Sequence, residues 1–218
     1  MLAAPRPDGR TDIAPPSVSA ILAPMERLKT QMAFLLELDK LKSVIRRNHL
    51  ADGSRLENDA EHSWYFAMAA LLLAEHAVEP IDLGRVVRMA LIHDIVEIDA
   101  GDTFIYDEAA KKDQAEREER AATRLFGMLP EDQARDLLAL FREFEEHKTA
   151  EARYARAIDR IAAVILNHAS AGKSWRLHGV PKERIVAINE RIAEGSPALW
   201  DYIRELIEDA SNRGFIAG

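Results

Sequence analysis

Apolar residues recur at spacings of three and four along most of the chain, and this pattern predicts helices. The first helix is expected from about Ala20 to Ile45. Its apolar face is formed by Met32, Leu35, Leu36, Leu38 and Leu41. A polar stretch with the turn-forming pair Asp52-Gly53 follows and predicts a loop. The next helix is expected to begin near Asn58, because Asn58 and Glu61 have the spacing of a capping box.

Further helix starts are marked along the rest of the chain. Asp82 is expected to cap a helix through LGRVVRMALIHDIVEI, with Val86, Met89, Ala90, His93 and Glu97 on one stripe. A charged helix is expected at 108–127, part of it as a solvated arm. Later helices are expected from Pro130 to about Glu146, over 150–168, after Pro181, and from Ser196-Pro197 to about Asn212.

The pattern predicts an all-α fold with one domain. No stretch combines sustained two-residue alternation with β-branched residues, so no sheet is expected. Residues 1–18 are rich in proline and have no apolar periodicity, which predicts a flexible leader. Residues 19–218 are predicted to form a single-domain helical bundle, a length sufficient for a sizeable core.

Charge and composition exclude several classes of function. The formal net charge of −8 disfavours binding to a nucleic acid polymer, although a small phosphorylated substrate remains compatible. The chain has no cysteine, which excludes disulfides and thiolate metal sites and fits a cytoplasmic protein. No secretory signal is recognisable. The apolar run at 67–74 is too short to span a bilayer, so no membrane contact is expected.

The adjacent pair His93-Asp94 carries the first sign of chemistry, because it lies inside the apolar run ALIHDIVEI. Burying both groups costs several kcal/mol unless a partner compensates, on the order of the transfer penalty of polar groups. A metal ion compensates both at once, since it binds a neutral imidazole and an ionised carboxylate. His62 and Asp159, each near or inside an apolar helical run, are the candidates that complete the site.

Two nitrogen and two oxygen ligands suit one divalent ion among Mn²⁺, Fe²⁺, Co²⁺, Ni²⁺ and Zn²⁺, and Mg²⁺ less well. Glu97 follows His93 by one helical turn and is placed to take a proton from water. Asp102, in a Gly-Asp turn after the helix, can orient a water or a substrate hydroxyl. Glu97 and Asp102 are therefore the candidate catalytic residues.

Each of these residues also has a structural interpretation. Asp159 can form a buried ion pair with Arg160 or Arg156 of its own helix. Glu97 and Asp102 can be solvated residues at a helix end, and Arg46 and Arg47 can favour a helix C-terminus. The remaining histidines are interpreted as surface or structural residues, namely His49, His76, His147, His168 and His178.

The order of these residues resembles the HD-domain phosphohydrolase superfamily, and the surrounding segments are similar to its 5'-deoxynucleotidases. The likeness covers about residues 26–210. It rests on the segments LKSVIRRNHL, ENDAEHSWYFAM, ALIHDIVEIDAGD and ARAIDRI. The motif comprises His62, His93, Asp94, Glu97, Gly101, Asp102 and Asp159.

The resemblance implies an HD-type helical bundle, a homodimer, and hydrolysis of deoxyribonucleoside 5'-monophosphates to nucleoside and phosphate. It also implies that His62, His93, Asp94 and Asp159 are metal ligands and that Glu97 is the catalytic glutamate. Arg46 matches an arginine that clamps the phosphate.

The same resemblance places Asp102 near the sugar. Arg47, a second candidate for substrate binding, stands where the best-known members carry tryptophan, so the preference for deoxyribose stays open. Two alternatives also stay open. One is the same site acting on a cyclic nucleotide or an alarmone, and the other is a non-catalytic helical module that binds a nucleotide or a partner protein.

Overall fold

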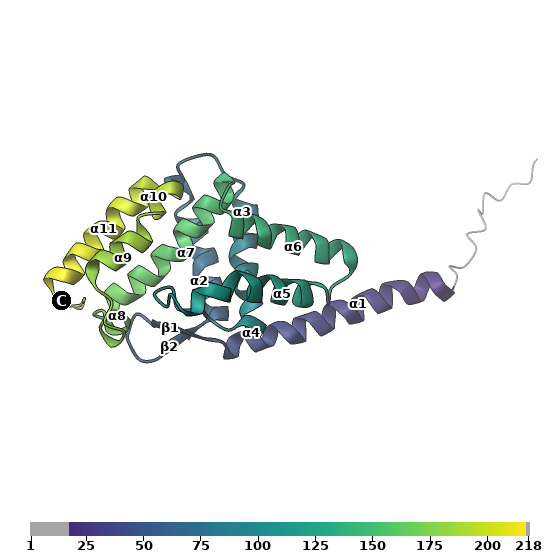
Figure 1. Ribbon diagram of the computed structural model, residues 1–218. Coiled ribbons are helices and arrows are strands. Elements are labelled where there is room, and N and C mark those ends of the chain that lie inside the picture. The colour runs from purple at the N-terminus through teal and green to yellow at the C-terminus, as the bar shows by residue number, and fades with distance from the viewer. Residues whose placement is uncertain (1–17, 217–218) are drawn as a thin grey trace, which may run out of the picture.

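The computed structural model describes residues 18–216, and helices form most of it (Figure 1). The first half of the described chain contains α1 (Val18–Leu38), β1 (Ile45–His49), β2 (Leu56–Asn58), α2 (Asp59–Leu72), α3 (Leu83–Ile92) and α4 (Glu97–Ala100). The second half contains α5 (Gln114–Phe126), α6 (Glu131–Glu146), α7 (Ala150–Ala169), α8 (Lys173–Leu177), α9 (Lys182–Asn189), α10 (Ile192–Gly195) and α11 (Pro197–Asn212). The predicted leader lies outside the described residues except for Val18, which begins α1.

Helix α7 occupies the middle of the molecule. Helices α2, α3, α5 and α6 lie on one side of it and α8 to α11 on the other (Figure 1). Its buried side chains include Tyr154, Ile158 and Ile161, each at most 2% exposed. Burying one such aliphatic side chain contributes about 1.5–3 kcal/mol. The helix that carries Asp159 is therefore held by apolar contacts on both sides.

The predicted helix starts at Asn58, Asp82 and Ser196 are confirmed. Asn58 Oδ1 accepts from Glu61 N at 3.0 Å, and the Glu61 carboxylate accepts from Asn58 N at 3.2 Å, which completes the capping box. Asp82 accepts from Arg85 N, and Ser196 accepts from Leu199 N. Each of these caps satisfies backbone groups that a helix end leaves without partners.

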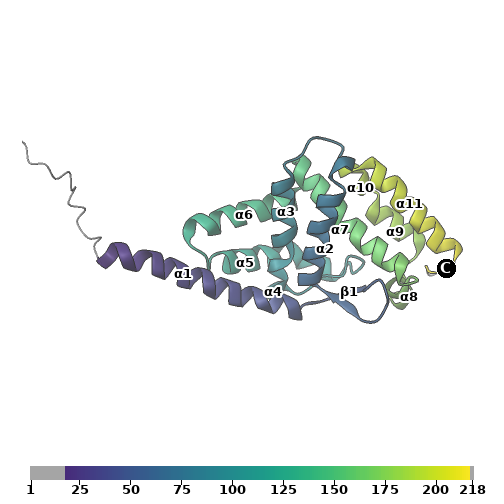
Figure 2. The same cartoon turned by 180° about the vertical axis from the view of Figure 1, so that it is seen from behind.

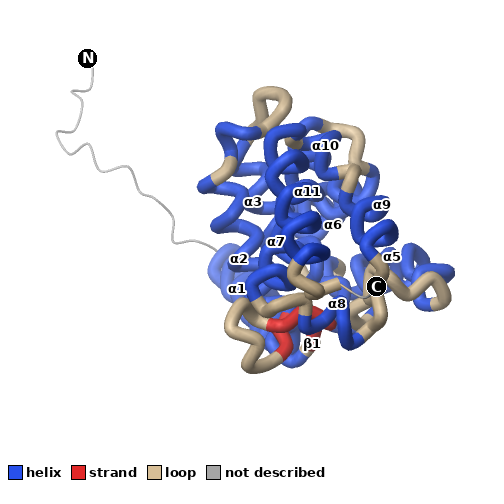
Figure 3. Tube along the Cα trace, turned by 90° about the vertical axis from the view of Figure 1, so that its left-hand side faces the viewer, coloured by secondary structure: helices blue, strands red, loops and turns tan. Residues whose placement is uncertain are grey.

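The prediction that there is no sheet is wrong. β1 and β2 form a two-stranded antiparallel ribbon, drawn in red in Figure 3, where the sequence suggested a helix end and a loop. The helix stops at Leu38, and a 3₁₀ turn, Asp39–Ser43, leads into β1. Strands of five and three residues are too short to display a recognisable alternation. The Asp52-Gly53 turn was predicted, and Gly53 has a φ of 69° there.

The pair His93-Asp94 does not lie in the middle of an α-helix, as the sequence suggested. Helix α3 ends at Ile92, residues His93–Val96 form a 3₁₀ turn, and α4 begins at Glu97. A 3₁₀ turn is more tightly wound than an α-helix, so it changes the direction in which successive side chains point. The stripe expected on this segment is nevertheless confirmed, because Val86, Met89 and Ala90 are fully buried.

Two other expectations about surfaces concern α5 and α1. Within the charged stretch at 108–127, residues 108–117 are exposed or half-buried, whereas Glu118, Ala121, Ala122, Leu125 and Phe126 of α5 are buried, so only part of the stretch is solvated, as expected. On α1, the expected apolar face is split, because Phe34 is buried while Met32, Leu35 and Leu36 are exposed. Seen from behind, α1 runs beside the helical body and extends past it, and α2 and α3 lie in front (Figure 2). No helix within residues 18–216 is long and apolar enough to cross a membrane.

Candidate metal centre and substrate chambers

The four predicted metal ligands come together from three segments. His62 lies on α2, His93 and Asp94 lie on the 3₁₀ turn, and Asp159 lies on α7. His62 Nε2 is 2.9 Å from Asp159 Oδ1 and 4.0 Å from Asp94 Oδ2. His93 Nε2 is 3.0 Å from Asp94 Oδ1 and 3.9 Å from Asp159 Oδ1. All four side chains therefore surround one small volume, and Asp159 is not paired with Arg156 or Arg160.

The hydrogen bonding of His93 fits a cation at that volume. Its Nδ1 lies 3.0 Å from Ala90 O, and because a carbonyl only accepts, Nδ1 carries the proton. The lone pair on Nε2 then faces two carboxylates, and this buried nitrogen has no hydrogen-bond partner among the described residues. A lone pair facing carboxylates is unfavourable unless a cation lies between them. Histidines that bind a metal through one ring nitrogen usually donate the other N–H to a carbonyl or a carboxylate, as His93 does here.

The charges around His62 and Asp159 support the same interpretation. Burial and Arg46 act to lower the pKa of His62, but the hydrogen bond to Asp159 and the carboxylate of Glu57, 3.6 Å from Nδ1, outweigh them and raise it to about 9. Burial acts to raise the pKa of Asp159, but the hydrogen bond from His62 and the charge of His62 hold it below its usual range. The site therefore favours positive charge at its centre, which a divalent ion supplies in place of a proton.

Arg46, on β1, contacts carboxylates that support the cluster. Its Nη1 donates to Asp94 Oδ2 at 2.6 Å and to Asp59 Oδ1 at 3.2 Å, and its Nε lies 3.8 Å from Glu57 Oε2. The side chains of Glu57 and Asp59 are at most 3% exposed. The guanidinium of Arg46 is thus engaged by three acidic groups of the protein itself.

Glu97 lies beside Asp59 and Asp94, with one carboxylate oxygen of each within 4.8 Å of the others. Burial, followed by the charges of Asp94 and Asp59, raises the pKa of Glu97 well above its usual value. Burial and the charge of Asp94 raise the pKa of Asp59 to about 6. Glu97 Oε2 and Asp59 Oδ2 are buried without a donor, and the nearby charges disfavour ionisation of both carboxyl groups at once. Glu97 is therefore equipped to hold and move a proton.

Two chambers adjoin the metal centre. One, of about 610 Å³ including its open mouth, combines aromatic and amide side chains: Phe104, Tyr106, Trp175, Asn48, Asn167 and Asn189. The other, of about 820 Å³ including its mouth, is lined mainly by charged side chains, among them Asp94, Glu97, Lys111, Glu118, Arg156 and Asp159. Asp102 and Arg46 line both chambers, while Arg47 lines the aromatic chamber.

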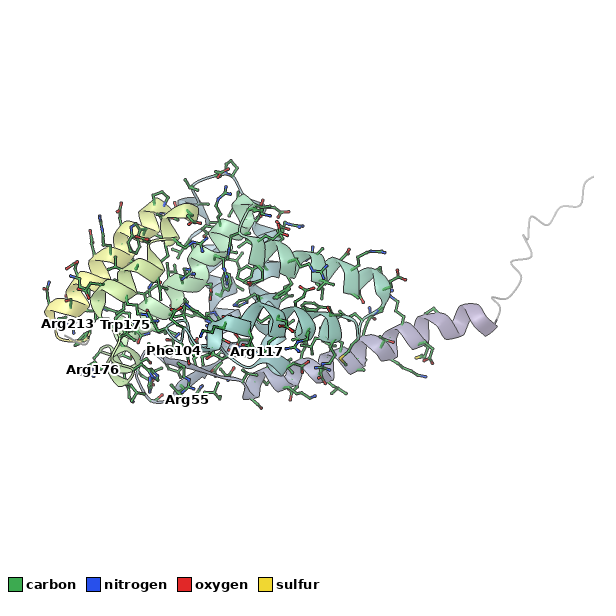
Figure 4. All side chains as sticks on the ribbon, in the orientation of Figure 1. Arg55, Phe104, Arg117, Trp175, Arg176 and Arg213 are labelled. Carbon is green, nitrogen blue, oxygen red and sulfur yellow. The ribbon has the colours of Figure 1, made fainter. Side chains whose placement is uncertain are left out.

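The loop that carries Asp102 is fastened by Arg117 of α5. Arg117 donates to Ala100 O at 2.5 Å, to Thr103 Oγ1 at 3.2 Å and to Ala110 O at 3.1 Å. Figure 4 labels Arg117 together with Phe104 and Trp175, and Phe104 lies on this loop. The loop that lines both chambers is therefore held in place by the guanidinium of Arg117, which the sequence analysis did not identify.

Sequence reasoning also missed Glu57, Asp59, Glu118 and Arg160. Glu57 and Asp59 flank the helix cap Asn58, where acidic residues are ordinary, so their burial was hidden. The other histidines were interpreted as surface or structural residues. Consistent with this, His49 is buried against Ser174, and His168 contacts Asp209.

The helical fold is shared with known structures. The model of the HD domain family matches residues 38–200, and the chain belongs to this family. A solved structure described as a predicted metal-dependent phosphohydrolase, from Magnetospirillum magnetotacticum MS-1, has a TM-score of 0.85 at 51% identity. It covers 89% of this chain and 98% of that one.

The chain is also similar in sequence to curated proteins of known name. The human 5'-deoxynucleotidase HDDC2 is 28% identical over 150 residues, which are 68% of this chain and 72% of the relative. The bovine 5'-deoxynucleotidase HDDC2 is 30% identical over 135 residues, 62% of this chain and 64% of the relative. The predicted family and helical fold are thereby confirmed.

Proposed function

We propose that this protein removes phosphate from deoxyribonucleoside 5'-monophosphates in a metal-dependent reaction. The observation that carries the proposal is the buried His93 Nε2, whose lone pair faces Asp94 and Asp159 without a donor. The names of the curated relatives support the choice of substrate class. The aromatic and amide side chains of one chamber suit a nucleoside, and the charged chamber suits a phosphoryl group.

His62, His93, Asp94 and Asp159 would hold one divalent ion. Such an ion polarises a phosphoryl oxygen and lowers the pKa of a water molecule. Mixed nitrogen and oxygen ligands favour Mn²⁺, Fe²⁺, Co²⁺, Ni²⁺ or Zn²⁺ over Mg²⁺, and metal availability decides among them.

The remaining residues act on protons and on orientation. Glu97, as an ionised carboxylate beside Asp59, would accept the proton of the attacking water and pass it on to the leaving oxygen of the sugar. Asp102 lines both chambers and is placed to orient a sugar hydroxyl. Arg46 fixes the carboxylates of Asp94 and Asp59, and with Arg47 it faces the substrate from β1.

The test is release of inorganic phosphate from a panel of ribo- and deoxyribonucleoside 5'-monophosphates, with Mn²⁺ and with Co²⁺. Phosphate release is expected for deoxyribonucleotides and should disappear in Asp94→Ala together with the bound metal. Cyclic nucleotides and alarmones belong in the same panel as alternatives. Absence of phosphate release from every monophosphate, or full activity of Asp94→Ala, would remove the proposal.

We also propose that the protein is a homodimer. Helix α2 presents an exposed apolar stripe, in which Trp64 is 64%, Met68 37%, Leu71 47% and Leu72 70% exposed. Contiguous apolar patches of this kind on a folded surface mark interaction sites. Sedimentation analysis should give a dimer that Leu72→Glu dissociates, whereas Leu177→Glu, a 69% exposed position on α8, leaves it intact. A monomeric wild-type protein at micromolar concentration would contradict this.

A cytoplasmic location is part of the same proposal. It is supported by the absence of cysteine from the sequence and by the intracellular supply of nucleoside monophosphates that the reaction needs. Fractionation of cells that express the protein, followed by detection with an antibody, tests the location directly. Recovery with membranes or in the medium would contradict it.

A further inference from the structure

Arg160 lies where the two chambers meet. It follows Asp159 on α7 and lines both the aromatic chamber and the charged chamber. Its single hydrogen bond within the described part of the chain runs from Nη1 to Ile188 O at 2.9 Å. No carboxylate oxygen lies within 4.0 Å of this guanidinium in residues 18–216. Most of its N–H donors are therefore directed at no protein acceptor.

The neighbouring arginines differ from Arg160 in this respect. Arg46 contacts Asp94 and Asp59, Arg156 lies 3.6 Å from Glu145, and Arg191 lies 3.0 Å from Glu194. Because a partly buried charge is unfavourable without a counter-charge, the isolated guanidinium of Arg160 calls for an anion. Its remaining donors are not enclosed by protein, so an anion in the chambers can reach them.

Resting on the function proposed above, we propose that Arg160 binds the phosphoryl group of the substrate, and the phosphate product, from the α7 side of the metal centre. A guanidinium offers paired N–H groups whose spacing matches two phosphoryl oxygens. Arg46 already donates to two carboxylates, so it adds little free positive charge to the chamber. Arg160 supplies that charge next to Asp159, in the lining that the two chambers share.

A purely structural role for Arg160 predicts a different effect of its replacement. Ile188 lies in the last turn of α9, where carbonyl groups lack helical partners, so Arg160 also caps that helix. If capping were its whole role, replacing Arg160 would lower the melting temperature and leave the affinity for phosphate unchanged. Affinity for inorganic phosphate is therefore the measurement that separates the two roles.

The experiment compares wild type, Arg160→Met, Arg160→Lys and the control Arg191→Met in the full-length protein loaded with Mn²⁺. Arg191 belongs to the same cationic cluster, but Glu194 neutralises it. Arg160→Met should raise the KM for dAMP and the inhibition constant of inorganic phosphate, each tenfold or more, as expected for the loss of a charge-assisted hydrogen bond. Arg160→Lys should recover part of the loss, and Arg191→Met should stay within twofold of wild type.

Direct calorimetric binding of inorganic phosphate keeps this inference separate from the proposed function. If wild type releases no phosphate from any nucleotide, the proposed function fails, and calorimetry still decides whether Arg160 binds an anion. An unchanged phosphate affinity in Arg160→Met, with or without a lower melting temperature, would overturn the inference. An equal loss in Arg191→Met would also overturn it, because the effect would then follow from general charge.

Discussion

The loop from Gly101 to Asp107 is expected to depend on Arg117, and Arg117→Met tests this. The substitution keeps most of the aliphatic stem and removes the donors to Ala100 O, Thr103 Oγ1 and Ala110 O. A net contribution of about 1 kcal/mol for each of the three bonds gives roughly 3 kcal/mol. The Arg117 side chain is 25% exposed, so water can replace some of the lost hydrogen bonds in the variant. We therefore expect the observed loop conformation to be destabilised by about 2 kcal/mol.

A loss of about 2 kcal/mol in the preference for the observed loop corresponds to a decrease in kcat/KM of up to about 30-fold. The assay is phosphate release from dAMP in the presence of Mn²⁺, together with hydrogen exchange of residues 101–113, which should become faster. Arg120→Met is the matched control, because Arg120 lies on the same helix and its side chain is 67% exposed. Equal kcat/KM and equal exchange in the two variants would refute the role given to Arg117.

Three further outcomes follow from the structure. Burial raises the pKa of Glu118 to about 7, so wild type loses stability as pH rises from about 4.5 to 7. Glu118→Gln should therefore be roughly 1–3 kcal/mol more stable than wild type at pH 8 but not at pH 4. Urea unfolding at the two pH values measures this, and equal differences at both would contradict it. Ser196→Ala removes the cap on Leu199 N and the bond to His76 O, and should cost about 1–2 kcal/mol in the same measurement. Chelation of divalent metal should lower the melting temperature of wild type, whereas Asp94→Ala should not respond.

Local signals in the sequence were sufficient for most of the helical framework. Caps such as Asn58, Asp82 and Ser196 act through backbone groups within three residues, so their effect is visible in the sequence itself. The buried stripe of α3 follows from its periodicity in the same way. The hairpin escaped prediction because its short strands are stabilised by each other and by contacts with α7 and α8, which depend on the whole fold.

The candidate site was only partly accessible to sequence reasoning. His62, the pair His93-Asp94 and Asp159 could be nominated because polar groups inside apolar runs need partners, and the structure brings these side chains together. Whether the guanidinium of a given arginine is paired with a carboxylate cannot be predicted in this way. Arg46 contacts three carboxylates and Arg160 contacts none within 4.0 Å among the described residues, a difference set by distant chain segments.

The central position of α7 restricts where substrate preference can be altered without loss of folding. Its apolar side chains, such as Tyr154, Ile158 and Ile161, pack against helices on both sides, so a change at those positions disturbs packing throughout the molecule. The tip of the hairpin and the exposed side of β1, including Arg47, meet solvent instead. Directed evolution toward new nucleotides should therefore accumulate its productive substitutions in β1 and in the segment 102–106, and leave the apolar positions of α7 almost untouched.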